Sequence, residues 1–165
     1  MGITRRESKI KRIRNSDRSL DYILEVPEKL SAVLSIKSEI GLKLKEAYDK
    51  ENKEVLKSIK NKEIPTIIKR VEDLRKAHRK QWLHMHKPFG WEVIDIRYGG
   101  LLTRLDTAIY RLNDYIEGRV ESIEELEEER LYFNEGVENS TGLGWCSYYY
   151  RIASPNVFFH VLPIY

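Results

Sequence analysis

The sequence predicts an all-α protein: a helical bundle of four or five helices followed by an irregular, partly extended aromatic C-terminal tail. Apolar residues recur every three or four positions over long stretches, which is the spacing of one buried helix face. The chain has 165 residues, of which 41% are hydrophobic, enough for one domain with a core. Charged residues make up 33% of the chain, which suits helices with long solvated faces.

The chain divides into three segments. Residues 1–19 hold seven basic and two acidic residues and few apolar ones, so we expect a basic leader that is frayed or partly helical, and that is disordered or acts as a linker. Residues 20–133 carry the helical pattern and form the predicted helical domain. Residues 134–165 combine glycines with many aromatic residues, without helical spacing. We expect this last segment to pack on the bundle as a tail, with a hairpin between residues 145–152 and 157–162 as one form it could take.

The first helix is predicted to start at Pro27, because proline suits the first position of a helix. Residues 22–24 could extend this helix backwards or form a separate turn. The spacing predicts a buried stripe along the helix. Its members are Leu30, Val33, Leu34, Ile40, Leu44 and Tyr48.

A second helix is predicted from Asn52, a good N-cap residue, to about residue 84. Pro65 lies inside this pattern. A proline in a helix removes one hydrogen bond and clashes with the preceding turn. We therefore expect a kink or a restart near residues 61–65.

Pro88 and Gly90 mark a loop, after which a third helix is predicted over about residues 92–118. Gly118 is the expected stop. The pair Gly99-Gly100 interrupts this helix, and each glycine costs roughly 1 kcal/mol relative to alanine. We expect another backbone to approach closely at that point.

A fourth, short helix is indicated by Ser122 and Glu125. Serine followed three residues later by glutamate is the capping-box pattern, in which each side chain accepts from a free backbone N–H of the first turn. Several glutamates follow, and negative charge favours the first turn of a helix. The sequence therefore predicts an acidic helix over about residues 123–132.

Composition and motifs argue against several classes of function. Lys+Arg and Asp+Glu number 29 and 26, and the resulting net charge of +3 does not favour nucleic acid or an anionic membrane as a partner. No stretch approaches the roughly 20 apolar residues of a membrane span. The chain has neither a nucleophile elbow nor a glycine-rich phosphate loop. The single cysteine, Cys146, and the lack of a signal-peptide pattern favour a cytoplasmic location.

Histidine spacing does not predict a metal site. His84 and His86 are two residues apart, whereas helical ligand pairs need a spacing of three or four. We therefore predict no metal and no cofactor. Glu92 and Asp95 could share a helix face as an acid/base pair, but no second group supports them, so no catalytic residue is predicted.

The segment from Phe89 to Gly100 is the densest mixture of aromatic, charged and glycine residues. Its charged members fall inside an apolar run, and buried charges need partners. They could form an ion pair or cap that fixes a helix junction. They could instead contact a sugar or a partner, since aromatic faces and oriented polar groups line such pockets. The candidates for a substrate-rim or interface role are Trp82, Phe89, Trp91, Asp95, Arg97 and Tyr98.

The same segment carries a resemblance to a known family. The run Lys87-Pro88-Phe89-Gly90-Trp91-Glu92-Val93-Ile94-Asp95-Ile96-Arg97-Tyr98-Gly99-Gly100-Leu101, within Arg75 to Leu131, resembles the C-terminal helical domain of a bacterial subgroup of glycoside hydrolase family 20. The stretch from Leu34 to Leu44 is also similar, and the resemblance covers roughly residues 20–133. Members are exo-acting β-N-acetylhexosaminidases with a small α/β domain, a catalytic (β/α)₈ barrel and this helical domain.

The resemblance implies a non-catalytic role. In that family the acetamido group of the substrate attacks the anomeric carbon, assisted by an adjacent Asp-Glu pair on the barrel. This chain has no Asp-Glu dipeptide; Glu72-Asp73 has the reverse order. We therefore expect a C-terminal domain, inactive alone, that supports the barrel of the parent chain, dimer contacts or the rim of the carbohydrate pocket.

Two other functions are weighed against this one. The first is a helical protein-interaction or oligomerisation module unrelated to sugar, because the aromatic tail could mark an interface. The second is nucleic-acid binding, which would rest on residues 1–19 alone. Steeply salt-dependent binding to DNA or RNA would be its signature.

Overall fold

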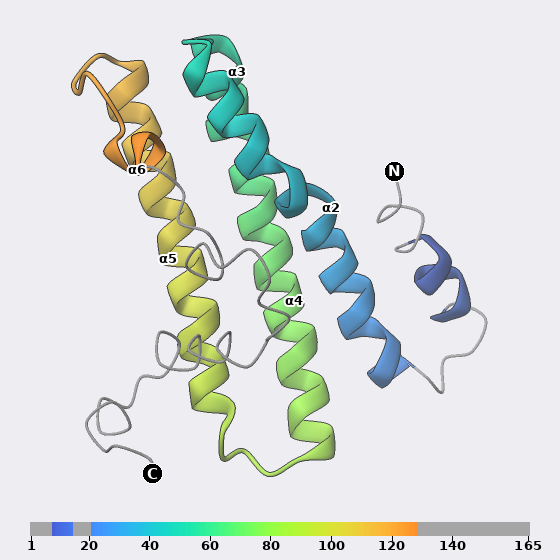
Figure 1. Cartoon of the computed structure of the whole chain (residues 1–165). Coiled ribbons are helices and arrows are strands. Elements are labelled where there is room, and N and C mark those ends of the chain that lie inside the picture. The colour runs from blue at the N-terminus through green and yellow to red at the C-terminus, as the bar shows by residue number, and fades with distance from the viewer. Residues whose placement is uncertain (1–7, 15–20, 129–165) are drawn as a thin grey trace, which may run out of the picture. The chain divides into compact units, whose positions relative to one another are not determined.

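A computed structural model describes residues 8–14 and 21–128, and all the regular structure in these ranges is helical (Figure 1). The predicted all-α class is thus confirmed. The described residues 8–14 and 21–126 belong to one compact unit. The predictions of a tail over residues 134–165 and of its hairpin lie outside the described residues. The acidic helix predicted over about residues 123–132 is shorter than expected, because it ends at Glu127 and Glu128 is not helical. The elements are a helix over residues 8–14, α2 (Asp21–Asp49), α3 (Lys53–Ser58), the π-helix η2 (Ile59–Glu63), α4 (Ile64–Met85), α5 (Trp91–Ile116) and α6 (Glu124–Glu127).

Helix α2 starts at Asp21, so the predicted start at Pro27 is wrong and the backward extension is correct. Pro27 lies inside the helix, where it removes one hydrogen bond. The turns around it are held by ion pairs from Arg14, whose guanidinium contacts Glu28 at 2.7 Å and Asp21 at 3.1 Å. Glu28 is buried, so this contact also satisfies a carboxylate that would otherwise be unpaired.

The second predicted helix is observed as α3, η2 and α4 in succession. The Asn52 side chain accepts a hydrogen bond from the Val55 N–H at 3.1 Å, which confirms the predicted cap. The chain then widens into the π-turn, and the N–H of Ile64 bonds to the carbonyl of Ile59. The predicted restart is confirmed, because α4 begins here with Pro65 in its first turn. A wider turn is tolerated before a proline, since its missing N–H leaves one helical bond unmade anyway.

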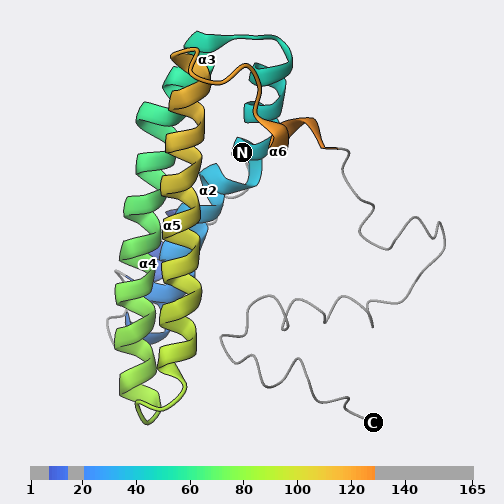
Figure 2. The same cartoon turned by 90° about the vertical axis from the view of Figure 1, so that its left-hand side faces the viewer.

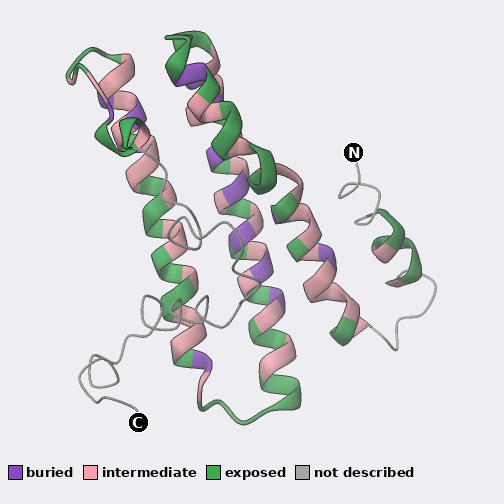
Figure 3. Cartoon of the chain, in the orientation of Figure 1, coloured by how far each residue is buried: buried purple, intermediate pink, exposed green. Residues whose placement is uncertain are grey.

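Helix α4 lies between α2 and α5, and the core follows α4 along its length (Figures 1 and 2). Buried positions recur along α4, while exposed ones cover the outer sides of all three long helices (Figure 3). Leu30 and Leu34 of the predicted α2 stripe are 44% and 39% exposed, so their assignment to the core is wrong. The largest fully buried side chains are Leu56, Ile59, Ile67 and Val71.

Helix α5 ends at Ile116, two residues before Gly118, which confirms the predicted stop. Gly118 has a φ of +73°, a left-handed conformation that favours glycine. Its N–H bonds to the Tyr115 carbonyl at 3.1 Å, and the N–H of Arg119 bonds to the Asp114 carbonyl at 2.8 Å. This is the Schellman pattern. The side chain of Arg119 also contacts the buried Asp114 carboxylate at 2.6 Å.

The close approach of another backbone expected at Gly99 and Gly100 is wrong among the described residues. Both glycines lie in open space, because a Cβ at either position would have no neighbour within 4 Å.

We predict that Gly99→Ala raises the free energy of unfolding by about 1 kcal/mol, because alanine forms helix better and meets no obstacle. Gly118→Ala should lower it by about 1 kcal/mol, because alanine is strained at positive φ. Urea unfolding of the two variants tests this; equal shifts would contradict it.

Helix α6 is anchored to the bundle rather than standing alone. The N–H of Ile123 donates to the Tyr48 hydroxyl at 3.0 Å, a buried contact between the end of α2 and the start of α6. Arg111 of α5 contacts the carboxylates of Glu124 and Glu125. The short helix was predicted from its capping pattern, but these contacts from α2 and α5 are what fix its position.

Candidate functional site

The α4–α5 elbow, residues 82–98, contains all six candidate residues. Its loop packs against Trp82, whose indole N–H donates to the Lys87 carbonyl at 3.0 Å. Gly90 has a φ of +93°, and a Cβ there would lie 3.4 Å from the Trp82 ring. The Gly90 N–H donates to Glu92 at 2.9 Å, at the first turn of α5. Only glycine fits this turn comfortably, so the loop holds α5 in a fixed place beside α4.

An aromatic cluster fills the elbow beneath the loop. Trp91 is only 7% exposed, and its ring centre lies 6.2 Å from that of Trp82. His78 of α4 meets Trp91 edge-on, with ring centres 5.3 Å apart. On its other side Trp82 stacks on His86, with ring centres 4.7 Å apart. Such tilted and edge-on pairs are favourable arrangements for aromatic rings.

Tyr98 joins the cluster through a hydrogen bond. Its hydroxyl lies 3.1 Å from Nδ1 of His78, which links α5 to α4. Burial raises the pKa of Tyr98 and lowers the pKa of His78. Both groups are therefore neutral near pH 7, which suits a packing contact rather than proton transfer.

The lowered pKa of His78 predicts a pH-dependent stability. The unfolded chain binds a proton at this residue near the ordinary pKa of 6.5, whereas the folded chain binds it only at lower pH. Stability should therefore fall as the pH drops below about 6.5 and level off below the folded pKa. His78→Gln should remove this part of the slope. Urea unfolding from pH 8 to 5 measures it, and parallel curves for the two proteins would contradict the prediction.

Asp95 forms an ion pair across the elbow. Its carboxylate contacts Arg75 of α4 at 3.0 Å, with 41% and 29% of the two side chains exposed. Of the two sequence interpretations, the ion pair that fixes a helix junction is the one observed for this residue. A pair this exposed contributes little to stability, although it links α5 to α4.

Phe89 and Arg97 differ from the other candidates because they face outward. Phe89 is 82% exposed at the tip of the loop. Arg97 is exposed, and no hydrogen bond or ion pair links it to the described part of the chain. The elbow thus exposes an aromatic ring and a guanidinium beside the buried Trp91.

His78 and Arg75 also contribute to the packing of the elbow. They were not among the predicted site residues, because their partners Tyr98 and Asp95 are 20 residues away in sequence.

Trp91 also has a buried polar group that makes no hydrogen bond to the described residues. Its indole N–H is buried without a hydrogen-bond partner among the described residues. A buried unpaired N–H costs free energy.

A cavity of about 110 Å³ lies away from the elbow, near α6. Arg111 contacts Glu125 at this cavity, and the second arginine of the lining, Arg104, leaves the lining with a net positive charge. Hydrogen bonds from its own backbone N–H and from Arg111 lower the pKa of Glu125, so this carboxylate is not a general acid near pH 7. The cavity is lined by Leu44, Arg104, Thr107, Ala108, Arg111, Leu112, Ile123, Glu125 and Leu126.

Within residues 8–14 and 21–128, no three His, Cys, Asp or Glu side chains gather in an arrangement that could hold a metal ion. Over the same residues no helix combines the length and apolar character needed to cross a membrane.

Comparison with known proteins adds one match. The model of a family described as the Glycoside Hydrolase 20C C-terminal domain matches residues 3–144 of the chain. This match includes α2 to α6 and the whole elbow. No curated protein sequence matches the chain significantly.

Proposed function

Because the chain belongs to the Glycoside Hydrolase 20C C-terminal domain family, we propose that it is the non-catalytic C-terminal domain of a β-N-acetylhexosaminidase, which hydrolyses terminal N-acetylhexosamine residues. The family match over residues 3–144 carries this proposal. The chemistry of the chain agrees with it. The sequence has no adjacent Asp-Glu pair, and the carboxylate of Glu125 in the cavity near α6 is paired with Arg111.

The elbow is the part of the domain best suited to the barrel or to the rim of its sugar pocket. A ring that is 82% exposed at Phe89 can pack on an apolar surface or on a sugar face. The exposed guanidinium of Arg97 can pair with a carboxylate or a hydroxyl. Both stand on a base held by the Arg75–Asp95 ion pair and by the aromatic cluster. The proposed partners are thus the barrel of the parent chain and its carbohydrate substrate, with a second copy of the chain at another face.

The elbow role is tested by removing the exposed ring in the enzyme that carries this domain. Phe89→Ala should lower kcat/KM for a chromogenic N-acetylglucosaminide about fivefold, the equivalent of about 1 kcal/mol from one aromatic contact. Leu42→Ala on α2 is the control, since Leu42 is also apolar and 64% exposed but lies away from the elbow. Equal activity of the two variants would contradict the role.

A further inference from the structure

The cavity near α6 has an apolar floor that is part of the hydrophobic core. Leu112 of α5 and Ile123, which directly precedes α6, are 2% and 4% exposed. Leu44 of α2 and Leu126 of α6 pack against the same core cluster. Three helices therefore contribute apolar side chains to one small space. Filling such a space with an apolar group is favourable, because its lining gains van der Waals contacts and leaves water.

The walls of the cavity are fixed by contacts within the bundle. The N–H of Ile123 donates to the Tyr48 hydroxyl at 3.0 Å, a buried hydrogen bond. Arg111 of α5 contacts Glu125 at 3.1 Å and also the carboxylate of Glu124. These contacts hold the start of α6 against α2 and α5. The cavity is thus formed before any ligand arrives, which lowers the free-energy cost of binding.

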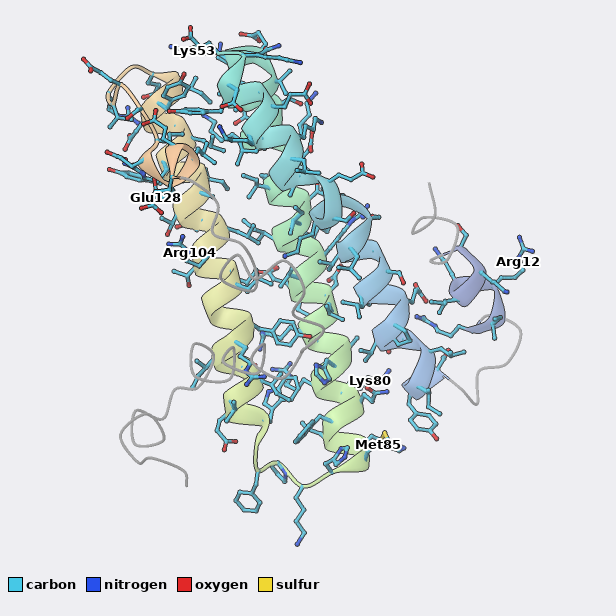
Figure 4. The ribbon with its side chains drawn as sticks, in the orientation of Figure 1. Arg12, Lys53, Lys80, Met85, Arg104 and Glu128 are labelled. Atoms are coloured by element: carbon cyan, nitrogen blue, oxygen red, sulfur yellow. The ribbon has the colours of Figure 1, made fainter. Side chains whose placement is uncertain are left out.

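Two arginines at the cavity have unused hydrogen-bond donors. Arg104 is exposed, and within the described part of the chain it makes no hydrogen bond or ion pair. Figure 4 shows Arg104 on α5 below α6, on the side away from α4. Nε of Arg111 is buried without a hydrogen-bond partner among the described residues, since the contacts to the glutamates are made by Nη2. An acceptor atom is therefore favoured here.

The size and charge of the cavity define its occupant. An apolar cavity of about 150 Å³ holds benzene, so the volume of about 110 Å³ here suits an apolar group of roughly four or five carbons. Drug-sized ligands occupy cavities of roughly 300 Å³ or more, and are excluded. An anionic head group would pair with the exposed guanidinium of Arg104, whereas a cationic one would be repelled by it.

We propose that this cavity binds a short-chain monocarboxylate, with its carboxylate on Arg104 and its alkyl chain against Leu112, Ile123 and Leu126. A guanidinium can hold both oxygens of a carboxylate side by side. Repulsion from Glu125 is reduced, because that carboxylate is paired with Arg111. The inference goes beyond the proposed enzyme role and does not depend on it, since every residue it uses belongs to this chain.

Binding is tested by titrating the full 165-residue chain with hexanoate and following the methyl NMR signals of Leu112, Ile123 and Leu126. These signals should shift and saturate with a Kd of about 1 mM, as suits a ligand of about eight non-hydrogen atoms. Hexanamide is the matched neutral ligand and should bind at least about tenfold more weakly, because it has no charge for Arg104. The proposal would be overturned by the absence of saturable shifts, or by equal binding of the two ligands.

The position of the carboxylate is tested by Arg104→Gln. This substitution removes the cation but keeps a long polar side chain, and it should weaken hexanoate binding about tenfold. Arg79→Gln on α4 is the matched control, because Arg79 is also exposed but does not line the cavity. Circular dichroism checks that both variants keep their helices. Equal Kd values for the two variants would contradict the assignment. Neither measurement involves hydrolysis, so its failure is distinct from failure of the proposed enzyme role.

Discussion

The Leu56→Ala variant is expected to lose about 3 kcal/mol of unfolding free energy, the typical cost of truncating a fully buried leucine. Leu56 is 0% exposed and belongs to the cluster in which α2, α3, α5 and the start of α6 meet. Its removal leaves a void that α3 cannot close, because the Asn52 cap and the following π-turn hold this short helix at both ends. Urea unfolding followed by circular dichroism measures the loss.

Leu42→Ala provides the matched control for that measurement. The residue type and the substitution are the same, but Leu42 is 64% exposed on α2. Its free energy of unfolding should stay within about 0.5 kcal/mol of the unchanged chain. A similar loss in both variants would mean that the helices do not pack as described.

The second large effect is expected at Trp91 in the elbow. Trp91→Ala should cost about 3–5 kcal/mol, because this ring is 7% exposed and fills the space between Trp82 and His78. Trp91→Phe should cost clearly less, since it keeps most of the ring and removes a buried N–H that has no partner among the described residues.

Phe89→Ala, two residues away, should change stability by no more than about 0.5 kcal/mol, because the ring is 82% exposed. The difference in stability loss between the Trp91 and Phe89 variants distinguishes a buried ring that packs the elbow from an exposed ring on its surface. A large loss of stability at Phe89, with little at Trp91, would reverse these roles. Thermal and urea unfolding of the three variants decide between them.

Much of the fold was predictable because local signals agree with the tertiary structure. The Asn52 cap, the restart at Pro65, the loop at Pro88 and Gly90, and the stop at Gly118 each follow from backbone chemistry within a few residues. Such signals act before any long-range contact forms, so a single sequence reveals them.

The errors come from long-range contacts that a local pattern does not contain. Pro27 indicates a helix start, but Arg14 and Glu28 stabilise turns on either side of it. Leu34 has helical spacing, yet α4 covers only the neighbouring Val33. The Gly99-Gly100 pair indicates a close approach that is absent among the described residues.

The sequence indicates the elbow as the candidate site, and this role stays a prediction, but the sequence does not distinguish the buried candidates from the exposed ones. The density of aromatic and charged residues identified the elbow, and all six candidates lie there. Composition could not show that Trp91 is buried while Phe89 is exposed, because both are aromatic residues of one short segment. Nor could it pair Asp95 with Arg75 or Tyr98 with His78, which depends on the packing of α5 against α4.

The central claim is that this domain supports a glycosidase whose catalytic groups lie on other polypeptide. The most direct measurement is release of chromophore from a chromogenic N-acetylglucosaminide by the purified 165-residue chain. We predict no release above the buffer blank. Turnover that stays with the chain through successive purification steps, in constant proportion to its amount, would contradict the claim.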